Sequence, residues 1–521
     1  MVVVHSLLEK AVRFFPDKEA VYDGKRRLLY RELESESNAA AAELKGMGIK
    51  QGDHIAVSLP NWHEFVVILF AISKIGAVIV PFNTKYQESE IEYILNNAKV
   101  KAAFFTGHVD ENQLWHHFYN ASQRSDYLKH LITVRYEHEE ALSFASLLEK
   151  GKEKSVSFPY LEAKDVFTIM YTSGTTGKPK GAMLTHYNVV KTAEMTADFM
   201  KCTADDVFLV PVPVFHIFGM VPSIMTAAAA KSKMVFIESF KAEKSLQLIE
   251  QEKVTVHHGV PTMFILELNH RDLKFYDLAS LRTGIAAAAP VPREIVGKIR
   301  KEMHCEILIS YGMTEASPCL TATTFEDTDK RRAETVGRAM PGVEVKVVDQ
   351  KTRHPVQPGE VGEIIVRSPG IMLGYFEMPE KTKEVLSDDG WYATGDLGTM
   401  DENGYLRIAG RKKDLIIRGG YNIYPREVEE HFYQHDAVSE VAIIGLPDTV
   451  LGEVTCASVK LKEGASATEE ELEEFIREKV AYYKVPDKIV IVPSLPMTAS
   501  GKISRMALQH QMDKQLAAEL R

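Results

Sequence analysis

The residues with the clearest chemical potential form one short stretch, Thr172–Gly181, with the sequence TSGTTGKPKG. Three glycines, four hydroxyl side chains and two lysines follow directly on the β-prone run 166–171. Glycines let a backbone approach an anion closely, hydroxyl and amide groups donate hydrogen bonds to it, and lysine supplies positive charge. The composition indicates a polyphosphate-binding loop, although flexible surface loops have a similar composition. A Walker A loop is excluded, because Gly177-Lys178 is followed by proline where that loop needs serine or threonine.

Composition and charge limit the classes of protein to consider. The chain has 521 residues, which suggests about three folding units at roughly 150 residues each. Its net charge of -10 argues against nucleic acid or an anionic membrane as the main partner. The 4 cysteines lack the spacing of a metal site or a disulfide framework, which is typical of a reducing compartment.

The sequence carries no pattern for export or for crossing a membrane. The N-terminus lacks a basic region before its apolar residues, and the longest apolar run, 65–72, is far shorter than the roughly 20 residues of a spanning helix. We therefore expect a cytoplasmic protein without a transmembrane segment. Its partners are expected to be small molecules, and the sequence leaves a homodimer open.

Helical and strand-like patterns alternate on both sides of the phosphate loop. Helices are expected at 29–47, 62–74, 242–251 and 293–303, and strands at 54–59, 76–81, 208–211, 234–237, 255–258 and 306–309. Helices that alternate with short apolar strands are typical of α/β layers around a parallel sheet. The loop would then lie at the end of a buried strand.

The pattern changes after residue 335. From 335 to 410 the chain is rich in glycine, proline and short alternating runs, which predicts a small antiparallel, barrel-like β unit. Beyond 411–414, strands are expected at 439–444, 456–461 and 488–492, with a helix at 468–480. Thr468 and Glu471 have the spacing of a capping box at the start of that helix. These elements predict a separate α+β domain.

The loop with its flanks, Tyr171 before it and AMLTHYN after it, resembles the signature of the adenylate-forming enzymes. That family comprises acyl-CoA synthetases, luciferases and peptide-synthetase adenylation domains. The resemblance implies that the loop holds the β- and γ-phosphates of ATP, with Thr172 near the metal. The implied ATP-binding residues in it are Thr172, Ser173, Gly174, Thr175, Thr176, Gly177 and Lys180.

A second motif, Tyr311–Glu315 (YGMTE), follows an expected buried strand, so its polar groups would lie at the carboxyl end of a sheet, where ligands usually bind. The resemblance places Tyr311 and Gly312 against adenine and Thr314 on the α-phosphate. It also makes Glu315 a ligand of Mg²⁺, with Thr314 and Glu315 both catalytic. Taken by itself, a Thr-Glu pair is more typical of a helix N-terminus than of a metal site.

The third motif, Tyr392–Asp396 (YATGD), precedes the basic run that begins at Arg411. By resemblance, Asp396 accepts hydrogen bonds from the ribose hydroxyls and Arg411 makes a second ribose or phosphate contact. Lys413 corresponds to the hinge between the two domains of the family. A basic run is usually a solvated face, but its place at an expected domain boundary favours the hinge.

Two further motifs lie in the C-terminal part. Gly419, Gly420 and Tyr421 resemble the segment that binds CoA in CoA-using members, where glycine lets the thin pantetheine arm pass close to the backbone. The segment 496–502 (PMTASGK) resembles the motif whose lysine, here Lys502, contacts the reacting carboxylate and the α-phosphate.

The resemblance implies the family's α/β fold, with a large N-terminal domain, 1–411, of two α/β subdomains plus a small β-barrel at 335–410. A small, mobile α+β C-terminal domain, 412–521, would follow. The implied substrates and cofactors are ATP, Mg²⁺ and CoA, and the implied reaction has two steps, from acid to acyl-adenylate and then to acyl-CoA. Mg²⁺, Lys502 and the loop donors would neutralise the charge of an anion attacking an anion. Rotation about Lys413 would present Lys502 in one step and the Gly420 face in the other.

Two apolar segments indicate which class of carboxylic acid is the substrate. His216 of PVFHIFG resembles the family histidine beside the acyl and CoA channels, although a lone histidine in an apolar run is otherwise a core residue. Gly284 and Ala288 lie in the segment 283–292, which resembles the acyl-pocket wall, and its alanines suit an alkyl chain as well as strand packing. We expect a medium- or long-chain fatty acid. The alternatives are an aryl acid, a carrier-protein thiol in place of CoA, and a nucleotide-binding protein that has lost catalysis.

Overall fold

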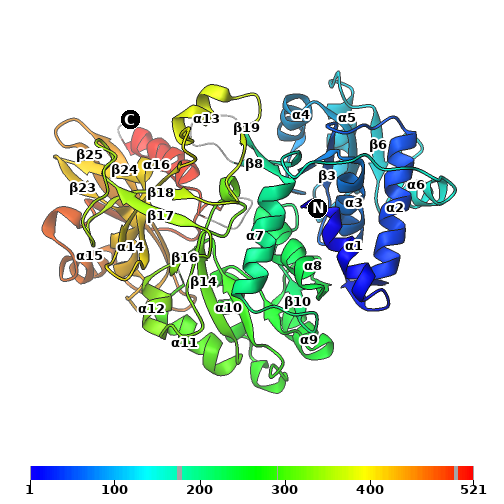
Figure 1. The fold of residues 1–521 in the computed structure, drawn as a ribbon. Helices are drawn as coiled ribbons and strands as arrows, with labels where there is room; N and C mark the ends of the chain where they lie inside the picture. Colours follow the sequence, from blue (N-terminus) through cyan, green and yellow to red (C-terminus); the bar gives the residue numbers. More distant parts are fainter. Residues whose placement is uncertain (1, 173–178, 290, 498–502, 520–521) are drawn as a thin grey trace. The chain divides into compact units, whose positions relative to one another are not determined.

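The computed structural model describes residues 2–172, 179–289, 291–497 and 503–519 (Figure 1). The chain divides into two compact units. The first comprises Met1–Glu344 with Val366–Tyr392, and the second comprises Val345–Ile365 with Ala393–Arg521. The predicted domain boundary at 411–412 stays a prediction.

A nine-stranded sheet forms one half of the first unit. Its strands, in spatial order, are β16 (Arg338–Ala339), β15 (Thr321–Ala322), β14 (Glu306–Tyr311), β13 (Thr283–Ala286), β12 (Val256–His257), β10 (Val207–Val210), β11 (Lys233–Phe236), β1 (Glu19–Tyr22) and β2 (Arg27–Leu29). The pairs from β14 through β1 are parallel, and the pairs at the two edges are antiparallel. The parallel centre is apolar and buried, as expected where helices cover a sheet.

An eight-stranded sheet forms the other half and carries the phosphate-loop strand. Its strands, in spatial order, are β19 (Gly374–Tyr375), β9 (Lys180–Thr185), β8 (Val166–Thr172), β4 (Val78–Pro81), β3 (His54–Ser58), β5 (Val100–Phe105), β6 (His130–Thr133) and β7 (Leu142–Ser143). Pairing is parallel from β8 to β7 and antiparallel for β8 with β9 and β9 with β19. Strand β19 therefore extends the sheet beside the strand that follows the loop.

The helices of the first unit connect these strands. They are α1 (His5–Phe14), α2 (Tyr30–Gly46), α3 (His63–Ile75), α4 (Glu88–Asn97), α5 (Leu114–Ser122), α6 (Phe144–Lys152), α7 (His186–Phe199), α8 (Thr226–Ala230), α9 (Ala242–Glu252), α10 (Pro261–Leu268), α11 (Arg293–Glu302), α12 (Asp329–Glu334) and α13 (Pro379–Val385). Helix α7 begins directly after β9 because the Thr185 side chain accepts a hydrogen bond from Asn188 N, a capping box. Helix α3 is buried over its whole length, which its nearly continuous apolar sequence dictates. The predicted α/β class is confirmed.

The second unit is built from antiparallel strands and a few helices. One sheet has the order β17 (Glu344–Val348), β18 (Gly362–Arg367), β20 (Tyr392–Met400), β21 (Leu406–Arg411). The other sheet has the order β23 (Tyr421–Ile423), β22 (Ile416–Arg418), β25 (Gly452–Leu461), β24 (Val438–Asp448). A further strand, β26 (Lys488–Ile491), pairs with β25 in parallel. Its helices are α14 (Pro425–Phe432), α15 (Glu469–Arg477) and α16 (Arg505–Glu519). Thr468 caps α15 by accepting from Glu471 N, so the predicted capping box is present.

Among the residues that the structure describes, none of the helices combines the length and the apolar character needed to cross a bilayer. The cytoplasmic location inferred from the sequence stays a prediction.

Candidate functional site

The phosphate loop connects two paired strands of the eight-stranded sheet. Strands β8 and β9 pair as far as Thr172 and Lys180, and Thr172 Oγ1 donates to the Lys180 carbonyl over 3.4 Å. These two predicted site residues are thus held side by side at the mouth of the loop. The other predicted loop residues lie outside the described residues: Ser173, Gly174, Thr175, Thr176 and Gly177. Lys502 also lies outside them.

Tyr375 of β19 connects Lys180 with Glu315. The Lys180 Nζ atom lies 4.4 Å from the centre of the Tyr375 ring. The Tyr375 hydroxyl donates to Glu315 Oε1 over 3.0 Å. The structure therefore brings Thr172, Lys180 and Glu315 together, although 135 residues separate Lys180 from Glu315 in the sequence. Sequence reasoning gave no role to Tyr375, because nothing local distinguishes it from the other tyrosines of the chain.

A second tyrosine hydroxyl, that of Tyr392, lies 3.5 Å from the Tyr375 hydroxyl. Burial, together with the nearby Glu315 carboxylate, raises the pKa of both tyrosines well above the ordinary value. Both hydroxyls therefore stay protonated and available as donors near neutral pH. Tyr392 opens the YATGD motif, yet that motif was interpreted only through its aspartate.

The YGMTE motif lies at the carboxyl end of β14, as predicted. Tyr311 is the last residue of that strand and is half-buried, and a short 3₁₀ helix begins at Thr314. A Cβ atom on Gly312 would lie 1.1 Å from the Pro318 carbonyl oxygen, so the chain path here requires glycine. The Glu315 carbonyl accepts from Met372 N over 2.8 Å. Glu315 therefore lies both in the first turn of this 3₁₀ helix and at the Tyr375 contact beside the phosphate loop.

Asp396 and Arg411, in the second unit, face each other on β20 and β21. Arg411 Nε lies 3.5 Å from Asp396 Oδ1, and the Asp396 side chain is 14% exposed. Asp396 N donates to Thr394 Oγ1, which donates to the Ile364 carbonyl. The two residues predicted to contact the nucleotide thus form an ion pair. The backbone of Asp396 is held by Thr394, and part of its side chain stays accessible to solvent.

The predicted hinge and the CoA segment follow directly. Lys413 lies in a short 3₁₀ turn, where partial burial and the positive charges of Arg411 and Arg505 lower its pKa. Gly419 and Gly420 form the two-residue connection between β22 and β23, with φ of 55° and 87°. Two left-handed residues are what a tight hairpin of this length needs. Glycine is therefore required by the turn itself, which gives it a structural reason besides the predicted CoA role.

The backbone at Gly420 is open, since a Cβ atom there would meet nothing within 4 Å. Beside it, the half-exposed Tyr421 ring stacks on Tyr483 with ring centres 4.5 Å apart. An exposed glycine backbone next to an aromatic ring leaves room for a thin, flexible ligand such as the pantetheine arm to lie along it. The hinge and CoA roles stay predictions.

His216 lies in the turn between β10 and a π-helix, Gly219–Met225. Its Nδ1 accepts from Phe218 N over 3.3 Å, and its side chain is half-buried. π-Helical turns are frequent at functional sites, and the sequence gave no signal for this one. His216 is therefore neither fully buried nor a plain core residue.

Gly284 and Ala288 lie in and just after β13. A Cβ atom on Gly284 would lie 1.8 Å from the His257 carbonyl oxygen, so close approach of β12 and β13 explains this glycine. Ala288 has φ of 75°, the left-handed region that favours glycine. Packing and backbone geometry thus account for both residues, and their contact with an acyl chain stays a prediction.

The conformation of Ala288 leads to a test of stability. We expect Ala288→Gly to raise the free energy of unfolding by about 1 kcal/mol, because an L-residue in the left-handed region costs about that much. Ala287→Gly is the matched control, and it should lower the free energy by roughly 0.5–1 kcal/mol, the usual cost of glycine. Urea unfolding of the full chain measures both. Equal effects of the two substitutions would contradict the strain at Ala288.

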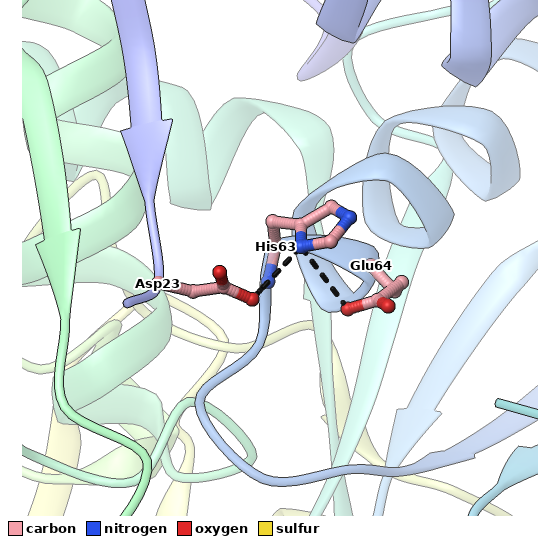
Figure 2. A group of neighbouring side chains, drawn as sticks. All are labelled: Asp23, His63 and Glu64. Atoms are coloured by element: carbon pink, nitrogen blue, oxygen red, sulfur yellow. Dashed lines mark hydrogen bonds and ion pairs between the residues drawn. The ribbon is translucent and has the colours of Figure 1, made fainter. Parts of the chain in front are cut away.

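One polar cluster lies outside the predicted residues. Asp23, His63 and Glu64 converge near the start of α3, with His63 Nδ1 2.8 Å from Asp23 Oδ2 and 3.3 Å from Glu64 Oε2 (Figure 2). Such a group can hold a metal ion. However, the Arg135 guanidinium pairs with both carboxylates and lies 4.3 Å from the Trp62 ring centre. The Arg135 cation already pairs with both carboxylates, so we assign the cluster to the internal packing of the first unit.

Comparisons with known proteins identify the family of this chain. The AMP-binding enzyme family matches residues 8–376, and the C-terminal domain of AMP-binding enzymes matches residues 427–502. YngI of Bacillus subtilis, provisionally named an acyl-CoA synthetase, is 40% identical over 98% of this chain and 97% of its own. The mitochondrial medium-chain acyl-CoA ligase ACSF2 of Danio rerio is 37% identical over 98% of this chain and 89% of its own. The anthranilate CoA ligase AuaEII, solved in complex with anthranoyl-AMP, is 26% identical with a TM-score of 0.89, over 98% of this chain and 97% of its own.

Proposed function

Since the chain belongs to the family of AMP-binding enzymes, we propose that it joins a carboxylic acid to CoA through an acyl-adenylate, with ATP as the energy source. The observation that carries the proposal is the link from Thr172 through Lys180 and Tyr375 to Glu315 at the mouth of the phosphate loop. These contacts connect Thr172, Lys180 and Glu315, whose hydroxyl, ammonium and carboxylate are the kinds of group that bind a triphosphate and its cation.

The acid that we propose is a medium- or long-chain fatty acid. Relatives with names such as medium-chain acyl-CoA ligase support it, and so does the apolar character of the segment around Gly284 and Ala288. The second candidate is an aryl acid, which the likeness to an anthranilate CoA ligase favours. Transfer to a carrier-protein thiol is the alternative for the second step.

The reaction consists of two displacements. In the first, a carboxylate oxygen of the acid attacks the α-phosphorus of ATP, and the bond to pyrophosphate breaks. In the second, the CoA sulfur attacks the acyl carbon, gives up its proton, and the bond between the acyl carbon and AMP breaks. Both steps move negative charge onto phosphate oxygens, so fixed positive groups and hydrogen-bond donors accelerate them.

The residues of this chain have distinct tasks in that scheme. Lys180 and the loop hold the β- and γ-phosphates, Tyr311 and Gly312 line the adenine, and Thr314 donates to the α-phosphate. Lys502 neutralises the carboxylate and the α-phosphate in the first step, whereas Gly419, Gly420 and Tyr421 accept CoA in the second. We propose a place for His216 beside the acyl and CoA channels.

The oxygen donors of Thr172 and Glu315 suit Mg²⁺, which prefers hard oxygen ligands and binds beside substrate phosphates. When bound, Mg²⁺ supplies charge neutralisation at the phosphates. Glu315 keeps acceptor capacity for it, because the Tyr375 hydroxyl uses only one of the roughly four lone-pair positions of the carboxylate.

The test of the proposal is a product assay over a panel of carboxylic acids, with and without CoA. We expect AMP and pyrophosphate to appear only with an accepted acid, and a thioester only when CoA is added. The panel contains fatty acids of graded length beside benzoate and anthranilate. Release of ADP and phosphate would contradict the proposal, and turnover of the aryl acids alone would replace the fatty acid by the second candidate.

Asp396 offers a separate test of the nucleotide site. We expect Asp396→Ala to raise the KM for ATP at least about tenfold, since a hydrogen bond to a charged group contributes about 1.5–3 kcal/mol. Asp396→Asn keeps one acceptor oxygen and should recover part of the loss. Glu402→Ala, on the exposed turn between β20 and β21, is the control and should leave KM unchanged. An unchanged KM for Asp396→Ala would remove the ribose assignment.

A further inference from the structure

Tyr375 contacts two proposed site residues of opposite charge. Its hydroxyl donates to Glu315 Oε1 over 3.0 Å, and its ring centre lies 4.4 Å from Lys180 Nζ. We propose that Tyr375 is a positioning residue that fixes the Glu315 carboxylate and the Lys180 ammonium relative to each other before MgATP binds. The inference rests on the proposed function, because it takes Glu315 as the ligand of Mg²⁺ and Lys180 as a phosphate contact.

The backbone around Tyr375 is anchored on both sides. Leu373 N donates to the Met183 carbonyl over 2.9 Å, and Phe376 N donates to the Gly181 carbonyl over 2.8 Å. Tyr375 N itself donates to Thr382 Oγ1 over 2.9 Å. Tyr375 is only 4% exposed. A buried side chain on a backbone held by these hydrogen bonds has little conformational freedom, and a positioning residue needs this rigidity.

The two contacts of Tyr375 use different parts of its side chain. The hydroxyl donates to the carboxylate over 3.0 Å. The ring face attracts the ammonium by a cation–π interaction. Lys180 has a long, flexible side chain, and holding it on the ring removes part of the ordering cost of binding a phosphate. The hydroxyl and the ring can therefore be removed separately.

Tyr375→Phe removes the hydroxyl and keeps the ring, whereas Tyr375→Leu removes both. The experiment measures the Kd of the Mn²⁺ complex of ATP by electron paramagnetic resonance, and the Kd of ATP in EDTA by calorimetry, on the full chain. We expect Tyr375→Phe to raise the first Kd about tenfold, the lower end of the usual effect of losing a partner of a metal ligand. Its Kd for metal-free ATP should stay at the parent value. Tyr375→Leu should raise both constants.

The matched control is Tyr30→Phe. The Tyr30 hydroxyl is fully buried in the same unit and donates to the Ser232 carbonyl over 2.6 Å, so its loss affects folding in a similar way. We expect Tyr30→Phe to bind the Mn²⁺ complex of ATP like the parent. Parent-like binding by Tyr375→Phe, or an equal loss in Tyr30→Phe, would overturn the inference.

The two proposals fail in distinguishable ways. If the parent forms AMP and pyrophosphate but Tyr375→Phe binds the Mn²⁺ complex of ATP normally, only the role of Tyr375 is wrong. If the parent forms neither product, the proposed function is wrong, and the binding constants still decide whether Tyr375 positions a metal ligand. If Tyr375→Leu does not fold, the comparison of Tyr375→Phe with Tyr30→Phe remains decisive.

Discussion

Lys502→Ala is expected to slow acyl-adenylate formation about a hundredfold, the usual loss when one preorganised contact to developing charge is removed, or about 3 kcal/mol. Conversion of supplied acyl-adenylate and CoA to thioester should continue near the parent rate. The reason is that only the first step brings a carboxylate against the α-phosphate. Single-turnover rates of the two half-reactions measure the difference.

Two further variants make this test specific. Lys479→Ala removes a lysine whose ammonium lies 5.3 Å from the Phe475 ring centre, and it should change neither rate. Lys413→Pro restricts the backbone at the proposed hinge, and it should slow thioester formation more than adenylation. Equal losses in both half-reactions for both Lys502→Ala and Lys413→Pro would count against alternation between two arrangements.

Acidification is expected to destabilise the first unit through two buried histidines. His186 accepts a hydrogen bond from Val4 N at Nδ1, and its Nε2 is buried with no hydrogen-bond partner among the described residues. His258 accepts from Ile285 N at Nδ1 and donates from Nε2 to the Pro222 carbonyl. Burial lowers the pKa of each histidine from 6.5 to about 3, with a smaller effect of nearby histidines. Both rings are therefore neutral in the folded protein.

The sign follows from the order of protonation. As the pH falls below about 6.5, the unfolded chain binds protons at these histidines before the folded chain does. Stability is thus complete above pH 6.5 and is lost progressively down to about pH 3. Each pKa unit corresponds to about 1.4 kcal/mol, so the two histidines together cost about 5 kcal/mol at pH 4.5.

Urea unfolding of the full chain at a series of pH values measures this loss. His186→Asn removes one titrating group and leaves an oxygen that can accept from Val4 N, so it should make the pH dependence less steep. His108→Asn changes an exposed histidine and is the control. A parent-like pH dependence in His186→Asn would show that His186 does not cause the acid loss.

The sequence was most informative where a structure depends on local pattern. The largely apolar segment 62–74 predicted a helix, and α3 occupies His63–Ile75, because a helix that is apolar on nearly all sides is buried. The strand expected at 306–309 is present as β14, and the motif after it lies at the carboxyl end of that strand, as predicted. The periodicity of apolar residues determines which face of an element is buried during folding, so the same periodicity predicts the element from the sequence.

The sequence was uninformative where a contact joins distant segments. Tyr375 lies beside the strand that follows the phosphate loop only because β19 pairs with β9. No local sequence pattern predicts that pairing. The π-helix with Pro222 inside it is another example, since proline usually argues against a helix interior. In both cases tertiary packing decides the local structure.

The pairing of β19 with β9 also has a consequence for biosynthesis. Gly374 of β19 pairs with Met183 of β9, which was synthesised roughly 190 residues earlier; at about 5–20 residues per second this is an interval of about 10–40 seconds. Until β19 emerges from the ribosome, β9 is the free edge of its sheet, and an unpaired edge strand is a template for aggregation. The nascent chain is thus exposed to misassembly at the strand that carries Lys180, and a chaperone acting during translation would protect this edge until β19 is made.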